Sequence, residues 1–433
     1  MSAINQELAL FAPAPMERAV HEVLFVEKRP VEQISKTGPI AFQLGETSSD
    51  YILLYKTKLA VKVRLLKEDN TPVDPTDEVA LVNLSLHSLF RQMDVALQQQ
   101  VVTPTVGTNY PYKAMFDVLL SYGTDSIESQ SQADGFYKDM ANSFDNPQGN
   151  SGHILRAQLT KFGFEADFEG PLHMDIAQQP KAILNGVPVT IKLFQHDDSF
   201  RLMSHGTKYQ VQITDALLKV CYLKVNPSVV LAHNEQLTKS PAVYPFYKSN
   251  IKTYGISSGS LAFTQDDIFH GLVPNKLIVA FTSSAAYSGD FTRSPFNFQH
   301  FKLNYLELAV DGHSIPSVPF QPKYAEHTYD DEGQDVTVNL KTGYIREYLS
   351  LYKNSYLQNS GNSITRSDYP YGYAIYVFDI KPGTNKEVLS AIGKGHTRLS
   401  ARFDSALSEP ITAIVYGRFP SELKIDQARN VIL

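Results

Sequence analysis

One order of elements occurs twice in this chain, and that repeat constrains the fold more than any other feature. In the first half, an apolar run at 90–97 leads through a turn to a helix signal at 110–122. In the second half, a similar run at 301–310 leads through a turn to a helix signal at 343–352. A stretch rich in glycine, asparagine and serine follows each helix signal, and more strand-like runs come after it. The repeat predicts two β-rich barrels or sandwiches of one plan, fused in a single chain.

Length and composition agree with that prediction. The chain has 433 residues, which is too long for one ordinary domain and suits two of about 200 residues each. Apolar residues make up 43% and charged residues 19%, while glycine, proline, tyrosine and phenylalanine each occur 24 times. Aromatic residues combined with turn formers favour strands over helical bundles. We therefore expect an all-β protein with a sizeable core.

Charge, cysteine count and apolar runs exclude several classes of protein. The net charge of −6 and pI near 6.1 argue against nucleic-acid binding by bulk electrostatics. Cys221 is the sole cysteine, so no intrachain disulfide can form, and its apolar surroundings predict a buried thiol. The N-terminal residues lack a basic segment, and no run approaches the ~18 apolar residues of a membrane span. We expect no signal peptide and no transmembrane segment, in a protein made inside a cell.

Several runs have clear periodicity. Apolar and charged residues alternate over 59–66, which predicts a strand with one buried face. A second alternating strand is expected at 187–193, after a type I′ turn at Asn185-Gly186. The run 217–225 is apolar nearly throughout and predicts a strand covered on both faces. The helix at 110–122 has apolar residues on one side and is expected to cover the end of a barrel.

The second half continues with strands and long polar loops. Strand-like runs separated by glycine and proline lie at 275–281, 301–310, 373–380, 398–403 and 411–419. Long polar loops are expected at 324–335 and 354–367, matching an excursion at 123–153 in the first half. An irregular segment of that length is uncommon in a compact domain, so 123–153 is predicted to be a functional or interface excursion.

These elements predict two tandem eight-stranded jelly rolls, a double jelly roll with short covering helices and long loops. Immunoglobulin-type sandwiches fit less well, because they have shorter loops and usually no helix. The predicted divisions are a flexible arm at 1–20, a first jelly roll at 21–226, a linker at 227–241 and a second jelly roll at 242–433. A proline near each end of the linker predicts a short helix at 228–239.

No motif of known chemistry stands out. The run 392–397 lacks the spacing of a phosphate-binding loop, and 257–260 lacks that of a nucleophile elbow, so both predict turns. His-x-His is absent, adjacent residues at 196–198 cannot all face one metal, and 329–335 lacks the ligand order of an EF-hand. Weak calcium binding at 329–335 is the minor alternative. We expect no catalytic, cofactor-binding or metal-binding residues, no cofactor and no enzymatic activity.

Other residues that could signal chemistry have simpler interpretations. The histidines beside apolar residues are predicted to be structural: His87, His173, His270 and His300. The tyrosines of 369–373 could form a sugar-binding or base-stacking surface, but core packing or subunit contact is the favoured interpretation. The glycosylation triplet at 83–85 lies in an apolar, strand-like run and is interpreted as a chance match.

Short motifs from about residue 20 to the C-terminal end resemble one known family in combination. They lie at 50–65, 82–90, 109–115, 119–123, 136–139, 296–300, 308–312 and 368–373. Together they resemble the major capsid proteins of Polintons (Mavericks) and adintoviruses, which are large virus-like DNA elements of eukaryotes. The resemblance implies a double jelly roll that forms pseudo-hexameric homotrimers tiling an icosahedral virion shell, without catalytic residues.

The same resemblance implies the partners. They are two further copies of the chain, neighbouring capsomers, and penton and other minor capsid proteins. The acidic charge adds that the shell encloses double-stranded DNA without sequence-specific binding. The arm at 1–20 could clamp a neighbouring capsomer or be a frayed terminus. Three other functions remain open: a tandem β-sandwich attachment protein that binds glycans, a cupin-type enzyme and a penton-type minor capsid protein.

Overall fold

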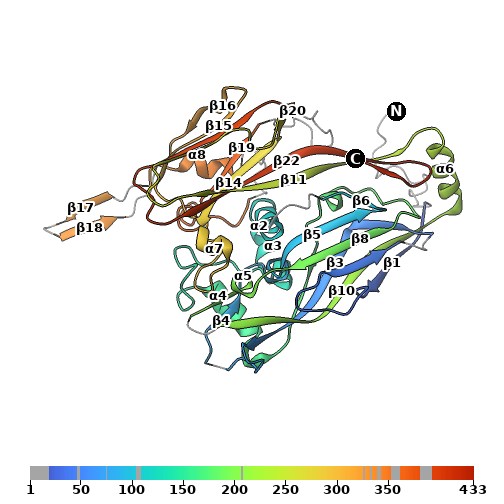
Figure 1. The fold of residues 1–433 in the computed structure, drawn as a ribbon, viewed down its shortest axis with the longest axis horizontal. Coiled ribbons are helices and arrows are strands. Elements are labelled where there is room, and N and C mark those ends of the chain that lie inside the picture. Colours follow the sequence, from blue (N-terminus) through green and yellow to red (C-terminus); the bar gives the residue numbers. More distant parts are fainter. Residues whose placement is uncertain are drawn as a thin grey trace, which may run out of the picture.

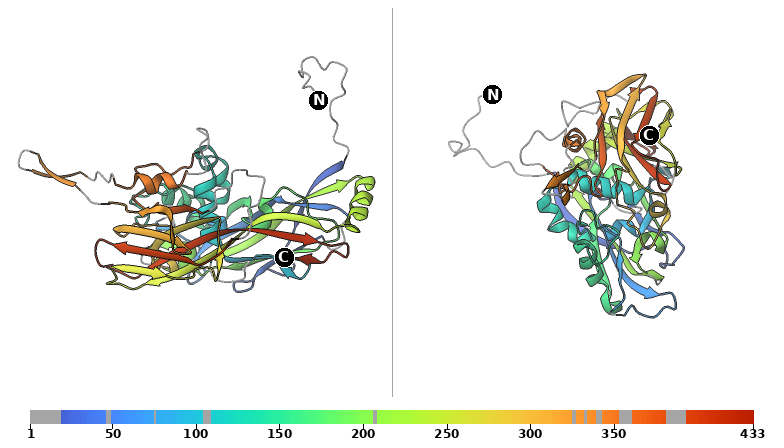
Figure 2. Two further views of the ribbon diagram at one scale, coloured as in Figure 1. Left: turned by 90° about the horizontal axis from the view of Figure 1, so that it is seen from above. Right: turned by 90° about the vertical axis from the view of Figure 1, so that its left-hand side faces the viewer.

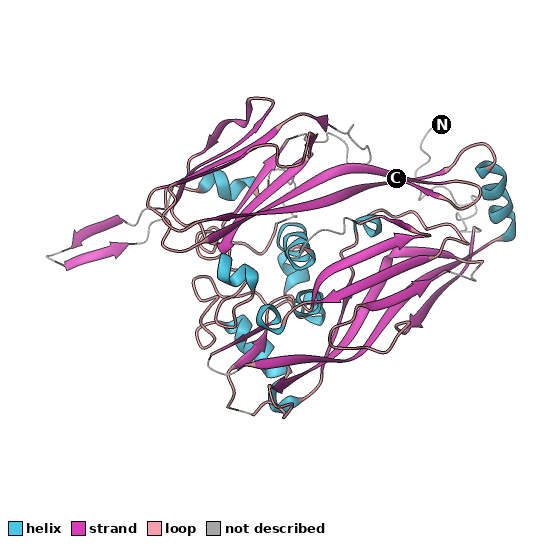
Figure 3. Ribbon diagram, viewed as in Figure 1, coloured by secondary structure: helices cyan, strands magenta, loops and turns pink. Residues whose placement is uncertain are grey.

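The computed structural model describes residues 19–45, 49–74, 76–103, 109–205, 208–324, 327–331, 334–338, 343–352, 361–380 and 393–433. The predicted arm at 1–20 therefore lies outside the described residues, apart from its last two. Strands dominate the described part of the chain, and the helices are short (Figure 3).

The first half forms two antiparallel four-stranded sheets. One has the order β1-β10-β3-β7 and the other β2-β8-β5-β6. Their strands are β1 (Val20–Lys28), β2 (Ile40–Leu44), β3 (Tyr51–Lys67), β5 (Phe90–Leu97), β6 (Gln100–Val101), β7 (Ala166–Pro171), β8 (Val189–Gln195) and β10 (Tyr209–Val225).

The second half repeats that arrangement strand for strand. Its sheets have the orders β11-β22-β14-β19 and β12-β21-β15-β16, so each strand takes the place of its counterpart in chain order. The strands are β11 (Ala242–Ile256), β12 (Ala262–Gln265), β14 (Lys276–Ser283), β15 (Leu303–Val310), β16 (His313–Phe320), β19 (Ile375–Asp379), β21 (Thr397–Phe403) and β22 (Ile411–Ile425), with β23 (Val431–Ile432) paired to β22. The predicted all-β double jelly roll is confirmed.

The hairpins that ended the two matching runs are also equivalent. In the β15–β16 hairpin, Val310 pairs with His313, and Asp311 and Gly312 between them have φ of 49° and 81°. Two left-handed residues form the tight turn that suits the twist of a two-residue hairpin. In the β5–β6 hairpin, Leu97 pairs with Gln100, and Gln98 has φ of 55°. The repeat read from the sequence is thus a repeat of structure.

Short strands and helices fill the connections. The strands are β4 (Val79–Leu81), β9 (Leu202–Ser204), β13 (Leu272–Val273), β17 (His327–Asp331), β18 (Gln334–Val338) and β20 (Gly393–Lys394). The helices are α1 (Ser85–Ser88), α2 (Tyr110–Ser121), α3 (Thr124–Ile127), α4 (Ser151–Leu159), α5 (Asp198–Arg201), α6 (Pro227–Leu237), α7 (Ser284–Ser288) and α8 (Ile345–Ser350), with 3-10 turns η2 (Gln130–Asp134), η3 (Lys161–Gly163) and η4 (Asp175–Gln178). Helix α6 confirms the predicted linker helix, and the exact domain limits stay a prediction.

The two jelly rolls lie side by side with α2 between them, and α6 joins them at one end (Figure 1). At the opposite end, β17 and β18 form a hairpin that projects from the second roll (Figures 1 and 2). The prediction of an irregular loop at 324–335 was therefore wrong for its strand residues. Of the loop predicted at 354–367, residues 354–360 lie outside the described part.

Three clusters of buried side chains form the interior. One lies inside the first roll, one inside the second, and one between the rolls around α2. The predicted alternation at 59–66 is confirmed, because Val61 and Val63 are buried in the first core while Lys62 and Arg64 are exposed. Each sheet of a jelly roll buries one face in this way.

Three local predictions need correction. Only Gly186 of the predicted type I′ turn has positive φ, and Arg429 donates to the Asn185 carbonyl, so a tertiary contact shapes the turn and the strand begins at Val189. In the 217–225 run, one side enters the core but Lys219 and Leu223 stay partly exposed. Helix α2 is buried on nearly all sides, instead of covering a barrel end with one face.

Strands β11 and β22 are long and extend from the second roll over the first (Figure 1). Their far ends place Tyr244, Phe246, Leu423 and Ile425 in the core of the first roll. Each of these side chains is at most 3% exposed. The first core is therefore completed by residues from the second half of the chain.

We expect Leu423→Ala to lower the free energy of unfolding by about 2–5 kcal/mol, because it removes a fully buried side chain and leaves a cavity. Urea unfolding followed by circular dichroism measures the loss. Leu261→Ala is the control, since Leu261 is 55% exposed and should change stability by less than about 0.5 kcal/mol. Equal effects of the two substitutions would contradict the shared core.

Candidate functional site

The junction between the two rolls combines a buried helix, α2, with buried ion pairs and a cluster of buried apolar side chains. Helix α2 lies against the outer face of the β11-β22-β14-β19 sheet, where Phe116 meets Tyr416 with ring centroids 6.1 Å apart. On the same face, Ile278 and Ile414 are 4% and 0% exposed. The opposite face of this sheet packs inside the second roll. This sheet is therefore buried on both sides, which is unusual for an antiparallel sheet.

A group of buried charges ties α2 to both rolls. Lys113 Nζ lies 3.1 Å from Asp117 Oδ2 and 3.2 Å from Asp175 Oδ1, and it donates to the His173 carbonyl at 2.7 Å. Asp175 in turn accepts from the backbone N–H of Ser249 on β11 at 2.9 Å. Burial alone would lower the pKa of Lys113, but the two carboxylates outweigh it and raise that pKa. The ammonium group is therefore a fixed positive charge that joins α2, η4 and β11.

Next to these charges lies a pair of buried groups that can titrate. His87 Nδ1 is 2.9 Å from the Tyr110 hydroxyl, and His87 Nε2 is 3.9 Å from Asp134 Oδ2. Burial lowers the pKa of His87 well below its ordinary value, and it raises the pKa of Asp134 to about 7. Neither His87 Nε2 nor Asp134 Oδ1 has a hydrogen-bond partner among the described residues. The pair is electrically neutral when Asp134 is protonated and His87 is not.

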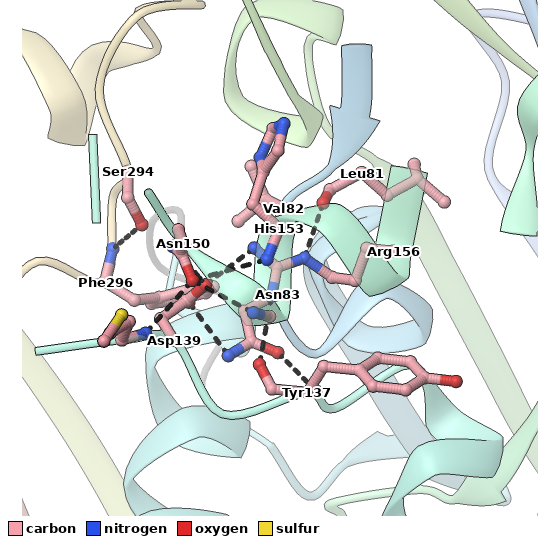
Figure 4. Close-up of polar contacts among 12 residues, drawn as sticks. Leu81, Val82, Asn83, Tyr137, Asp139, Asn150, His153, Arg156, Ser294 and Phe296 are labelled. Carbon is pink, nitrogen blue, oxygen red and sulfur yellow. Dashed lines mark hydrogen bonds and ion pairs between the residues drawn. The ribbon is translucent and has the colours of Figure 1, made fainter. Parts of the chain in front are cut away.

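A second buried network holds the 123–153 excursion in place (Figure 4). Arg156 donates to the carbonyls of Leu81 and Tyr137 and to Asp139 Oδ1, at 2.9, 3.0 and 2.8 Å. Asp139 also accepts from Asn83 at 3.0 Å and from Asn150 at 2.8 Å. Arg156 and Asp139 are each 1% exposed. Every charge in this network is paired and hydrogen-bonded, as a stable buried ion pair requires.

Asn83 belongs to this network, so the interpretation of 83–85 as a chance glycosylation match is supported by burial. Asn83 is 3% exposed and its side-chain oxygen accepts from the backbone N–H of Leu84 and Tyr137. The triplet begins in a turn before α1, so its predicted strand conformation was wrong.

The excursion at 123–153 contacts the second roll directly. Asp145 accepts from the backbone N–H of Ser294 at 2.7 Å and from Asn297 at 3.0 Å, and the Tyr373 hydroxyl donates to the Asp139 carbonyl at 2.7 Å. Lys138 pairs with Asp368 at 2.6 Å. These contacts agree with the interface interpretation of 123–153, within one chain. The prediction that this segment is irregular was wrong where α3, η2 and the start of α4 lie.

The histidines and tyrosines singled out in the sequence differ in how deeply they are buried. His173 is buried and the ring of His300 stacks on Tyr324 with centroids 4.0 Å apart, but His270 is exposed and its structural assignment was wrong. Tyr369 and Tyr373 are 0% and 3% exposed, in the cluster between the rolls. Core packing is therefore confirmed for these two tyrosines.

Residues that could bind a metal ion together are not assembled in the described ranges. No group of three His, Cys, Asp or Glu residues is placed to hold an ion there. Cys221 is a buried free thiol, as predicted. His196 stacks on Phe200 at 3.8 Å, and burial lowers its pKa to about 3. Among the helices that the structure describes, none has the length and apolar character to cross a bilayer.

A cavity of about 800 Å³ opens at the junction, on the side of the second roll's connections. Its lining combines the excursion with three connections of the second roll, contributed by Asp145, His300, Tyr371 and Ser405 among others. The Asp145 carboxylate already accepts two hydrogen bonds there. The cavity lies between packed loops, and the hydrogen bonds of the Asp145 carboxylate connect the excursion to the second roll.

Sequence reasoning missed both buried polar networks. Lys113 and Asp117 stand four residues apart in an otherwise apolar helix, a spacing that brings their side chains together. An oppositely charged pair within an apolar helix was the one sequence feature that could have indicated burial of the polar side of the helix as well. Arg156 gave no such signal, because its partners come from residues 81, 137 and 139.

Comparison of the sequence with protein-family models gives no match. A protein of Caenorhabditis elegans that is described as uncharacterized is 23% identical over 411 residues, covering 92% of this chain and 93% of that protein. The two proteins are therefore similar along almost their whole lengths.

Solved structures of similar fold cover nearly the whole chain. The Sputnik virophage structure from cryo-EM matches with TM-score 0.61 and 10% identity, covering 100% of this chain and 92% of that chain. A quasi-atomic model of the PBCV-1 virus capsid matches with TM-score 0.55 and 11% identity over 98% and 99% of the two chains. The mavirus major capsid protein matches with TM-score 0.54 and 10% identity over 99% and 93%. At such low identity these matches establish the shared fold.

We expect Arg156→Met to destabilise the protein by about 3–5 kcal/mol, because Asp139 would keep a buried charge without its cation. Chemical denaturation measures the change. Arg64→Met is the matched control, since Arg64 is 44% exposed and lies 3.8 Å from Glu165, so its loss should cost less than about 1 kcal/mol. A small effect of Arg156→Met would show that the network does not hold the excursion.

We expect Asp134→Asn to change how stability depends on pH. The pKa of Asp134 is about 7 in the folded chain and near 3.8 when exposed, so the folded state binds more protons between these values. The free energy of unfolding of the natural chain should therefore fall, relative to the variant, as pH rises from about 4 to about 7, by up to about 1.4 kcal/mol per pH unit. Denaturant unfolding at pH 5, 6, 7 and 8 measures the difference, and the exposed Asp125→Asn is the control. A constant difference across this range would contradict the raised pKa.

Proposed function

We propose that this chain is a structural major capsid protein whose homotrimer forms a pseudo-hexameric capsomer of an icosahedral shell. The observation that carries the proposal is the identical strand order of the two fused rolls. Three chains with two equivalent rolls each supply six similar units, which can close into a ring of nearly hexagonal outline. The matched structures from Sputnik, PBCV-1 and mavirus are described as viral or capsid structures and have the same fold.

The finer assignment is to the Polinton (Maverick) and adintovirus type of element. Two observations support it: the motifs that run along both halves, and a similar protein of nearly equal length in an animal, Caenorhabditis elegans. An element resident in eukaryotic genomes accounts for a relative of that kind. The protein would then reside in the virion, after synthesis and assembly inside the host cell.

Partners and divisions follow from the same proposal. The capsomer contacts neighbouring capsomers and penton and other minor capsid proteins, and the acidic chain encloses double-stranded DNA without sequence-specific binding. The arm at 1–20 is proposed to clamp a neighbouring capsomer, and the domain divisions are those given above, at 21–226, 227–241 and 242–433. The proposed role is structural, with no catalytic step.

The described structure gives little support to a glycan-binding attachment protein. That function needs aromatic rings exposed as a platform, but Tyr369 and Tyr373 are buried between the rolls. A single-roll penton is a poorer fit as well, because this chain contains two rolls of the same strand order.

Purified protein is expected to have three times the 48.4 kDa mass of one chain by light scattering, and to form hexagonal tiles or closed shells in negative-stain images. A mass of one chain at all concentrations that permit measurement would overturn the proposed capsomer. The control is the same preparation in denaturant, which should give the mass of one chain.

A further inference from the structure

The two equivalent sheets of the two rolls differ in what covers their outer faces. The outer face of the β11-β22-β14-β19 sheet lies under α2 and has almost no exposed surface, as Ile414 at 0% exposure illustrates. The outer face of the β1-β10-β3-β7 sheet has no such cover among the described residues, and there Val23 is 47% and Phe25 66% exposed. One position in the repeat is thus filled and its counterpart is open.

The outer face of the β1-β10-β3-β7 sheet, called the open face below, has the composition of an interaction surface. Val23 and Phe25 on β1 and Tyr55 on β3 are large apolar or aromatic side chains exposed on one sheet. Beside them lies a shallow hollow of about 310 Å³, whose lining includes Ala60 and Leu217. An exposed group of apolar side chains on a soluble protein commonly marks an interaction site.

Charged pairs on the same face leave it available for binding. Lys58 and Lys219 lie 3.8 and 2.5 Å from Glu169, and Lys62 lies 3.8 Å from Asp167. Their side chains are between 34% and 73% exposed, so the pairs contribute little stability and rearrange at small cost.

The second roll has a helix in the position that corresponds to α2. Both α2 and α8 lie between the fifth and sixth of the eight strands of their jelly rolls, α2 between β6 and β7 and α8 between β16 and β19. Both helices stand on the same side of the strands (Figure 2). Helix α2 buries its side chains against the neighbouring roll, whereas Leu349 on α8 is 53% exposed. Close to it, Val318 on β16 is 57% exposed, and Arg346 of α8 donates to the Val318 carbonyl.

We propose that α8 of one copy, through Leu349 and its surroundings, docks on the outer face of the β1-β10-β3-β7 sheet of the next copy. The argument rests on the proposed ring of six similar rolls. In such a ring, a rotation of one sixth of a turn places the first roll where the second roll of the same chain stands. The contact of α2 with the outer sheet face of the second roll is then the contact that each roll makes with the next roll in the ring. The next such rotation leads to another copy, so the contact within one chain is the template for the contact between chains.

The template also explains the difference in composition of the two faces. The face under α2 is shielded from water once the chain is folded, so its centre can be apolar and aromatic, as Ile278, Ile414 and Tyr416 are. The face on the first roll must be soluble in the free chain, and it therefore mixes Phe25 and Val23 with ion pairs. Mixed composition of this kind is typical of interfaces that form after folding.

The test uses the full chain with charge introduced on the open face. Phe25→Asp places a carboxylate where α8 would dock, and we expect the concentration for half-dissociation of the trimer to rise by roughly tenfold or more. Val23→Asp is a second variant of the same face. Leu231→Asp on α6 is the matched control, because Leu231 is 70% exposed and lies on the linker helix. Unchanged circular dichroism and melting of diluted protein establish that each variant folds.

Cross-linking identifies the surface on the other copy. A chain with Phe25→Cys and Leu349→Cys, treated with a flexible bis-maleimide, should yield dimers and trimers on a denaturing gel, while each single variant alone should yield almost none. The natural Cys221 is 0% exposed and will react little.

The outcomes separate the two proposals. Weakened association together with the double-cysteine cross-link supports the docking of α8. A trimer that tolerates Phe25→Asp and Val23→Asp, or that gives no cross-link, overturns this contact while the capsomer stands. A natural chain that stays monomeric overturns the capsomer and this contact together.

Discussion

The structure depends above all on the burial of one sheet on both of its faces. The β11-β22-β14-β19 sheet has the core of its own roll on one side and α2 on the other. Removing apolar surface from water is the main driving force available to a chain without disulfides. Because the outer face includes Ile278, Ile414 and Tyr416, its exposure to water would be unfavourable, and the two rolls are joined by the same force that folds each of them.

Buried charges then determine which arrangement of the two rolls forms. Apolar contact is not directional, and several placements of α2 on a flat apolar face would be nearly equal in free energy. Asp175 meets both Lys113 of α2 and the backbone N–H of Ser249 on β11 in only one of these placements, and any other would leave a buried charge poorly paired at a cost of several kcal/mol. Arg156 and Asp139 do the same for the excursion at 123–153. The charges thus specify orientation, and the apolar surface supplies the stability.

The sequence predicted features that depend on neighbours along the chain. The Asp311-Gly312 turn and the alternation of Val61 with Lys62 are local, so strands, hairpins and the repeat could be read directly. The surroundings of α2 were beyond reach, because its second buried face depends on a sheet that begins at Ala242. The β17–β18 hairpin was missed since its residues 327–338 are largely polar and lack an apolar alternation. The hydrogen-bond acceptors of Arg156, such as the Leu81 carbonyl, are distant in the sequence, so no local pattern predicts them.

The extension of β22 over the first roll affects how the chain folds during synthesis. Leu423 and Ile425 complete the first core, yet they are synthesised long after β10, the last strand of the first roll. The first roll therefore cannot reach its final packing before residues 423–425 have been synthesised. A polypeptide that has not yet reached residue 423 consequently lacks side chains that the interior of the first roll needs, so this roll is finished only after the second has been made.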